Sequence, residues 1–118
     1  MNGQPALRVS TPLSLVGATD QHSVLQQINE GYKDKFVLFL RSRAAEGGSA
    51  TLKKSHLPNT QVLKGLRLGD LLQAEALATQ QCLTEVGVSN MTLQMDQFNE
   101  ENLGHILMFM QLSVLALG

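Results

Sequence analysis

The sequence predicts an α/β fold, and two neighbouring segments carry the prediction. Val24, Leu25 and Ile28 recur at helical spacing after Gly17, which indicates an amphipathic helix. The next apolar segment, residues 36–40, is hydrophobic almost without interruption, as is typical of a parallel strand covered on both faces. A helix followed by a buried strand is the unit from which layered α/β domains are built.

The stretch Gly17-Ala-Thr-Asp-Gln-His-Ser23 opens this helix, and it is where we expect any chemistry. Thr19 or Asp20 is a suitable N-cap, because its side-chain oxygen can accept from a backbone N–H one turn on. This places His22 in the first helical turn. A histidine can take and give a proton near neutral pH, so His22 is a candidate general acid or base. The alternative is that this histidine is a solvated or capping residue.

The composition argues against several classes of function. The 118 residues carry a formal net charge of −1, so there is no basic excess to attract nucleic acid or an anionic membrane, and neither is an expected partner. The single Cys82 cannot form an internal disulfide, and no signal-peptide pattern is found, so a cytoplasmic location is expected. His22, His56 and His105 do not have the spacing of metal ligands, and no metal or other cofactor is expected.

Two polar segments are predicted to be loops. Residues 1–11 combine turn-forming dipeptides with few apolar side chains, and could include a short strand at 6–9. Residues 42–56 have no clear periodicity. Lys53 and Lys54 in this segment could steer a phosphate group, but a solvated surface loop is the favoured interpretation.

A long helix is expected after the second loop. It opens near residue 57 with Asn59 or Thr60 as cap, and its apolar positions continue to about residue 83. Gly65 and Gly69 are unfavourable in a helix, so they mark either a local break or a close approach by another backbone. Gly87 closes the region.

The remaining sequence predicts a short strand and a last helix. Residues 91–95 alternate between apolar and polar side chains, and Asn99 is the expected cap of a helix over residues 103–117. This helix is apolar nearly all round and too short to cross a bilayer, so a core or interface position is expected. Glu75 and Cys82 are given structural roles, and His105, at one edge of the apolar surface, is expected to be a hydrogen-bonded structural residue.

Three blocks of sequence, in order, resemble the glucose-6-phosphate isomerase family. Thr19-Asp-Gln-His-Ser23 and the strand after it are similar to the family's Gln-His helix and next strand. Gln73-Ala-Glu-Ala-Leu-Ala78 resembles its Gln-Thr-Glu-Ala-Leu-Ala helix, and Val88-Ser-Asn-Met91 its Pro-Asn strand entry. Leu103-Gly104-His-Ile-Leu107 is similar to its Leu-Gly-Ala-Leu-Ile helix. Three blocks in one order are far more specific than a single motif.

This resemblance implies a three-layer α/β/α sandwich around a mainly parallel sheet, of the sugar-isomerase (SIS) type, with residues 1–118 forming an incomplete second domain. The family interconverts glucose 6-phosphate and fructose 6-phosphate without a metal. A histidine helps to open the sugar ring, and a glutamate moves a proton between C1 and C2. By motif, His22 is the ring-opening residue, and Gln21 orients it or borders the sugar. A homodimer with His22 near the subunit interface is also implied.

The resemblance further implies that part of the active site is missing. The family's proton-shuttling glutamate lies before the Gln-His motif and its substrate-binding lysine after the last matched helix, and this sequence matches neither pattern. We therefore expect part of an isomerase that is inactive alone. Two alternatives remain open: a noncatalytic module that binds sugar phosphate, and a dimerisation module that uses the apolar last helix.

Overall fold

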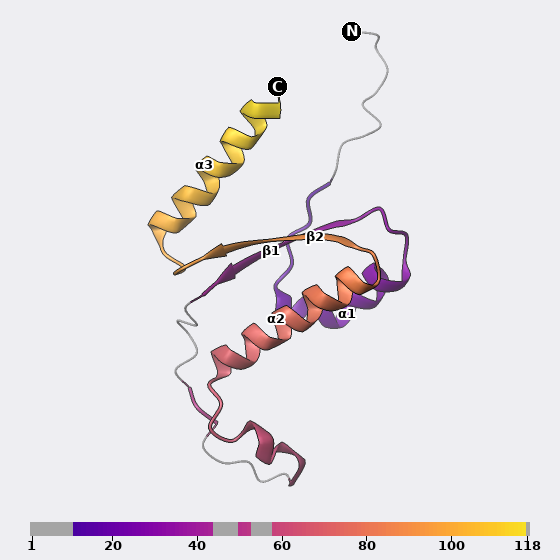
Figure 1. The fold of residues 1–118 in the computed structure, drawn as a ribbon, viewed down its shortest axis with the longest axis vertical. Helices are drawn as coiled ribbons and strands as arrows, with labels where there is room; N and C mark the ends of the chain where they lie inside the picture. Colours follow the sequence, from indigo (N-terminus) through magenta and orange to yellow (C-terminus); the bar gives the residue numbers. More distant parts are fainter. Residues whose placement is uncertain (1–10, 44–49, 53–57, 118) are drawn as a thin grey trace.

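A computed structural model describes residues 11–43, 50–52 and 58–117 of the chain. The elements in order are α1 (Gly17–Glu30), β1 (Phe36–Ser42), the 3-10 helix η1 (Pro58–Leu63), α2 (Leu68–Glu85), β2 (Ser89–Met95) and α3 (Glu100–Leu117) (Figure 1). The strand suggested at 6–9 and most of the loop expected at 42–56, with Lys53, Lys54 and His56, lie outside the described residues. Ser42, assigned to that loop from the sequence, is instead the last residue of β1.

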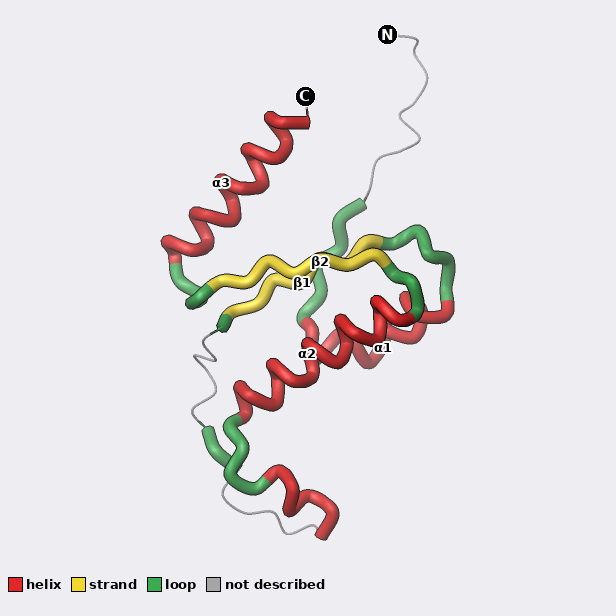
Figure 2. The backbone as a smooth tube through the Cα atoms, viewed as in Figure 1, coloured by secondary structure: helices red, strands yellow, loops and turns green. Residues whose placement is uncertain are grey.

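The two strands form a parallel pair, with Phe36 opposite Ser89 at one end and Ser42 opposite Met95 at the other. Parallel strands need a crossover connection, and here it runs through η1 and α2. In Figure 2, α1 and α2 lie on one side of the pair and α3 extends on the other. The predicted α/β class is confirmed. In the described part of the chain the sheet has two strands, so the sandwich is incomplete.

The core is small: two of its residues flank the turn from α2 to β2, and the third lies at the carboxyl end of β2. In the described ranges, the buried hydrophobic side chains are Leu83 at 1% exposure, Val88 at 3% and Met95 at 8%. Gly87 adopts a left-handed conformation with φ of 77°. The N–H of Val88 donates to the carbonyl of Leu83 (2.8 Å), and the N–H of Gly87 donates to that of Thr84 (3.1 Å). This Schellman pattern brings the buried residues on either side of the turn together, and Gly87 ends the helix as predicted.

The start of α1 differs from the prediction. Val16, rather than Thr19 or Asp20, is the N-cap, and the Asp20 carboxylate accepts a hydrogen bond from the Val16 N–H at 2.6 Å. Asp20 therefore reaches back to the residue before the helix, much as the acidic residue of a capping box does. The helix begins at Gly17, and His22 lies in its second turn instead of its first.

The long helix expected from residue 57 is divided in two. η1 ends at Leu63, Gly65 has a φ of 87°, and α2 begins at Leu68. A left-handed residue cannot continue a right-handed helix, so the predicted break occurs at Gly65. Gly69 is instead buried in the first turn of α2.

The last helix is capped as predicted but is not buried. The Asn99 side-chain oxygen accepts from the Asn102 N–H at 2.9 Å, which fixes the start of α3. Eight of its large apolar side chains are nevertheless 48% to 90% exposed, namely Leu103, Leu107, Met108, Phe109, Leu112, Val114, Leu115 and Leu117. The other described residues therefore do not cover α3, and the helix does not lie in a core formed by them. None of the helices in these ranges has the combined length and hydropathy of a membrane span.

Candidate functional site

His22 lies on the exposed surface of α1, next to the partly buried Gln21. In the described ranges, the structure gives the His22 ring no hydrogen bond. Among the described residues, the Asp20 carboxylate accepts from the N–H of Val16 at 2.6 Å and makes no hydrogen bond to the ring. The Gln21 amide nitrogen lies close to the start of the helix, 3.6 Å from where a Cβ on Gly17 would stand. The imidazole is therefore accessible to a substrate or to a side chain from another segment.

A hydrogen bond joins the C-terminal end of α1 to α2. Asn29, which follows His22 by two turns on the same side of the helix, donates through Nδ2 to the Cys82 sulfur at 3.5 Å. Cys82 is partly buried, which agrees with the packing role expected for it. Since this contact lies near the C-terminus of α1, it positions the helix while leaving His22 uncovered.

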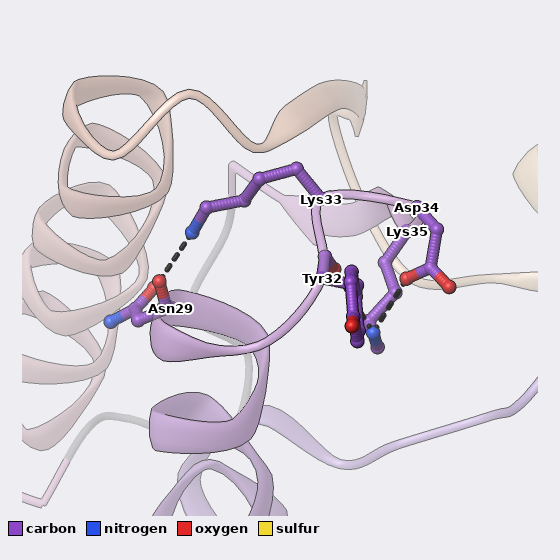
Figure 3. A network of polar contacts seen from close by, with 5 residues as sticks. All are labelled: Asn29, Tyr32, Lys33, Asp34 and Lys35. Atoms are coloured by element: carbon purple, nitrogen blue, oxygen red, sulfur yellow. Dashed lines mark hydrogen bonds and ion pairs between the residues drawn. The ribbon is translucent and has the colours of Figure 1, made fainter.

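Lysine side chains shape the turn between α1 and β1 (Figure 3). Lys33 Nζ donates to the carbonyl of Asn29 in the last turn of α1, where a cation stabilises the helix C-terminus. Lys35 Nζ donates to the Tyr32 carbonyl at 3.2 Å and to the Asp34 carboxylate at 2.7 Å. The hydrogen bond and charge of Lys35 hold the pKa of Asp34 below its ordinary value. These contacts fix how the chain leaves α1 and enters β1.

A second polar constellation lies at the carboxyl end of β1. The Arg41 Nη2 donates to the Gln73 side-chain oxygen at 2.6 Å, and the Gln73 amide nitrogen donates to the Ser42 carbonyl at 2.5 Å. Gln73 thereby ties α2 to the end of the strand. Sequence reasoning missed this pair. Its one signal is an arginine at the end of an otherwise apolar strand, which does not identify a partner 32 residues away.

His105 does not have the structural role expected for it. It is exposed, and no residue in the described ranges hydrogen-bonds to its ring. It borders a shallow hollow of about 320 Å³ between the end of β2 and the first turns of α3, which Met95, Asp96, Asn102 and Phe109 also line. Neither His22 nor His105 joins a cluster of three or more potential metal ligands among the residues described.

The chain is similar to known enzymes over nearly its whole length, although no family model matches it. It is 33% identical over 111 residues to glucose-6-phosphate isomerase of Rubrobacter xylanophilus, covering 92% of this chain and 26% of that enzyme. Identity to glucose-6-phosphate isomerase of Methanocaldococcus jannaschii is 30%, with the same coverage of both chains. A probable glucose-6-phosphate isomerase of Natronomonas pharaonis is 33% identical over 92% of this chain and 25% of its own length. The chain is therefore similar over about nine-tenths of its length to glucose-6-phosphate isomerases, and it spans about a quarter of the length of these relatives.

Proposed function

We propose that residues 1–118 form part of the second sugar-isomerase domain of a glucose-6-phosphate isomerase, acting in the cytoplasm on glucose 6-phosphate and fructose 6-phosphate. The observation that carries the proposal is the match of about nine-tenths of the chain to enzymes of that name. The parallel strand pair flanked by helices supports it, because such pairs are pieces of layered α/β sheets. The proposed reaction uses no metal or other cofactor.

In this proposal His22 assists ring opening. Opening a cyclic sugar requires a proton to reach the ring oxygen while the hydroxyl on the anomeric carbon loses one, and an imidazole can make both transfers near neutral pH. The exposed ring of His22, with no partner in the described part of the chain, is available for this task. Gln21 is proposed to border the sugar or to orient His22. The glutamate that moves the proton between C1 and C2 would come from sequence outside these residues.

The same exposure supports a proposed homodimer. An acid/base residue at the surface of its own chain needs a second surface to exclude water and to complete the site. We propose that His22 serves the active site of the neighbouring subunit and that α1 places it there. The hydrogen bond from Asn29 to Cys82 would help to hold α1 in position.

A chimera provides the experiment. The matching segment of the Rubrobacter xylanophilus enzyme is replaced by this chain, and isomerisation of fructose 6-phosphate is followed in a coupled assay. The chimera is expected to turn over. His22→Ala should slow turnover of the cyclic substrate by about 10² to 10⁴, the usual contribution of general acid/base catalysis. Proton exchange on an open-chain substrate, which needs no ring opening, should fall much less.

His105→Ala in the same chimera is the matched control, because His105 is also an exposed helix histidine but has no proposed role. Its turnover should stay within about twofold of the parent chimera. Equal losses on cyclic and open-chain substrates after His22→Ala would assign His22 to isomerisation or binding instead of ring opening. A folded chimera that neither turns over nor binds sugar phosphate would contradict the proposed function.

One observation favours a second candidate, a dimerisation module. α3 exposes many large apolar side chains that the other described residues leave uncovered, and apolar surfaces of this kind mark protein interfaces. Sedimentation of the isolated chain, together with the activity of the chimera, distinguishes the dimerisation module from the isomerase part. A discrete dimer of the chain together with an inactive chimera would favour the dimerisation module.

A further inference from the structure

Among the described arginines, the two exposed ones lie near carboxylates, whereas the partly buried one does not. Arg43 and Arg67 are exposed, with 73% and 68% of the side chain accessible, and each lies near an aspartate, Asp96 at 3.6 Å and Asp70 at 3.3 Å. Arg41 is the less exposed residue, yet no carboxylate within the described residues pairs with it. Burial makes an unpaired charge costly, so the least solvated arginine has the greatest need of an anion.

Gln73 holds the Arg41 guanidinium in one orientation. Its amide nitrogen donates to the Ser42 carbonyl at 2.5 Å, which turns its oxygen toward Arg41, where it accepts from Nη2 at 2.6 Å. The Arg41 Nε is buried and has no hydrogen-bond partner in the described ranges. One N–H of Nη2 is used by Gln73, so within the described ranges the second N–H of Nη2 and the two of Nη1 remain as three donors at the end of the guanidinium.

The position of Arg41 in the sheet adds a second argument. Arg41 is the last but one residue of β1, opposite Gln94 of β2, at the carboxyl ends of the two parallel strands. Open α/β sheets bind their ligands at this edge. A guanidinium presents parallel N–H groups that match two oxygens of a phosphate or a carboxylate, and such charge-assisted pairs are the strongest hydrogen bonds that side chains make.

We propose that Arg41 and Gln73 form a binding site for a small oxyanion at the carboxyl end of β1. Nη1 and Nη2 of Arg41 donate to two oxygens of the anion, and Gln73 acts as a positioning residue for the guanidinium. A phosphate group and a carboxylate share the required chemistry. The site lies on elements other than α1, which carries His22, and it does not depend on isomerase activity.

The experiment titrates the isolated chain with sodium phosphate and, separately, with sodium acetate at constant ionic strength. Nuclear magnetic resonance follows the Nε–H signals of the arginines and the side-chain amide of Gln73. Saturable shifts are expected at Arg41 and Gln73, with little change at Arg43. Tighter binding of phosphate assigns the site to phosphate-bearing ligands, and equal or tighter binding of acetate assigns it to carboxylates.

Two variants separate this site from general attraction of anions. Arg41→Gln should weaken binding by about tenfold or more, the scale expected for a lost charge-assisted pair. Arg43→Gln, at the same strand end and equal in charge change, should alter it by less than about twofold. Equal effects of the two substitutions, or no saturable shift at Arg41 in the unmodified chain, would overturn the proposal. If Arg41→Gln does not fold, the residue-specific shifts of the unmodified chain decide the question alone.

Discussion

Replacing Gly87 by alanine tests whether the turn after α2 organises the core. A Cβ at this position would have no atom within 4 Å, so crowding adds no cost. The cost comes from the backbone, because an L-residue at a φ of 77° is strained by about 1 to 2 kcal/mol. After allowing for the smaller entropy of the unfolded alanine chain, the free energy of unfolding should fall by about 1 kcal/mol. This corresponds to a melting temperature lower by about 4 °C.

Gly104→Ala is the matched control. Gly104 lies inside α3, it also has no atom within 4 Å of a built Cβ, and its φ is not positive. Alanine should stabilise α3 by about 1 kcal/mol, so the same substitution has opposite signs at the two sites. Urea unfolding followed by circular dichroism measures the first effect, and amide hydrogen exchange within α3 measures the second. If Gly87→Ala were neutral or stabilising, an L-residue would be unstrained at this φ, and the predicted cost of the left-handed turn would be wrong.

Three further predictions concern the isolated chain. It should not isomerise fructose 6-phosphate in a coupled assay, and turnover within about tenfold of the usual 1 to 10³ per second would contradict this. Sedimentation should show that the chain self-associates through α3, and the double substitution Leu112→Glu and Leu115→Glu should reduce this association. If the unmodified chain stays monomeric at high concentration, the prediction is wrong. Asp34 should titrate below its ordinary pKa, so its small stabilising effect is present above about pH 4 and is lost as the pH falls through the lowered pKa. Lys35→Gln should raise the pKa of Asp34, and an unchanged titration of Asp34 in this variant would show that Lys35 is not the cause.

Local patterns predicted the elements whose cause is also local. The apolar run at 36–40 became β1, the alternation at 91–95 became part of β2, and Gly87 and Asn99 end and begin helices where expected. Each of these depends on a few neighbouring residues, either through side-chain periodicity or through a hydrogen bond to a nearby backbone group.

Errors arose where a residue had more than one possible partner. Asp20 was expected to accept from residues after it, but it accepts from Val16 before it, and the start of α1 moved accordingly. The pairing of Arg41 with Gln73 joins a strand to a helix across the crossover, and no spacing rule connects the two. His22 was located from the motif, and its assigned role in ring opening stays a prediction. The exposure of α3 could not be predicted, since periodicity shows which residues are apolar and not whether another surface covers them.

The parallel pairing of β1 and β2 also determines when the sheet can form. Each pair, such as Phe36 with Ser89, joins residues 53 positions apart. Closing a loop of that length costs about 3.5 kcal/mol in chain entropy before the first strand hydrogen bond is made. The helices need no such closure and can form first, so the sheet is the slow step of folding. During synthesis, the apolar residues of β1 leave the ribosome well before β2 exists, and they cannot pair with β2 until residues 89–95 have emerged.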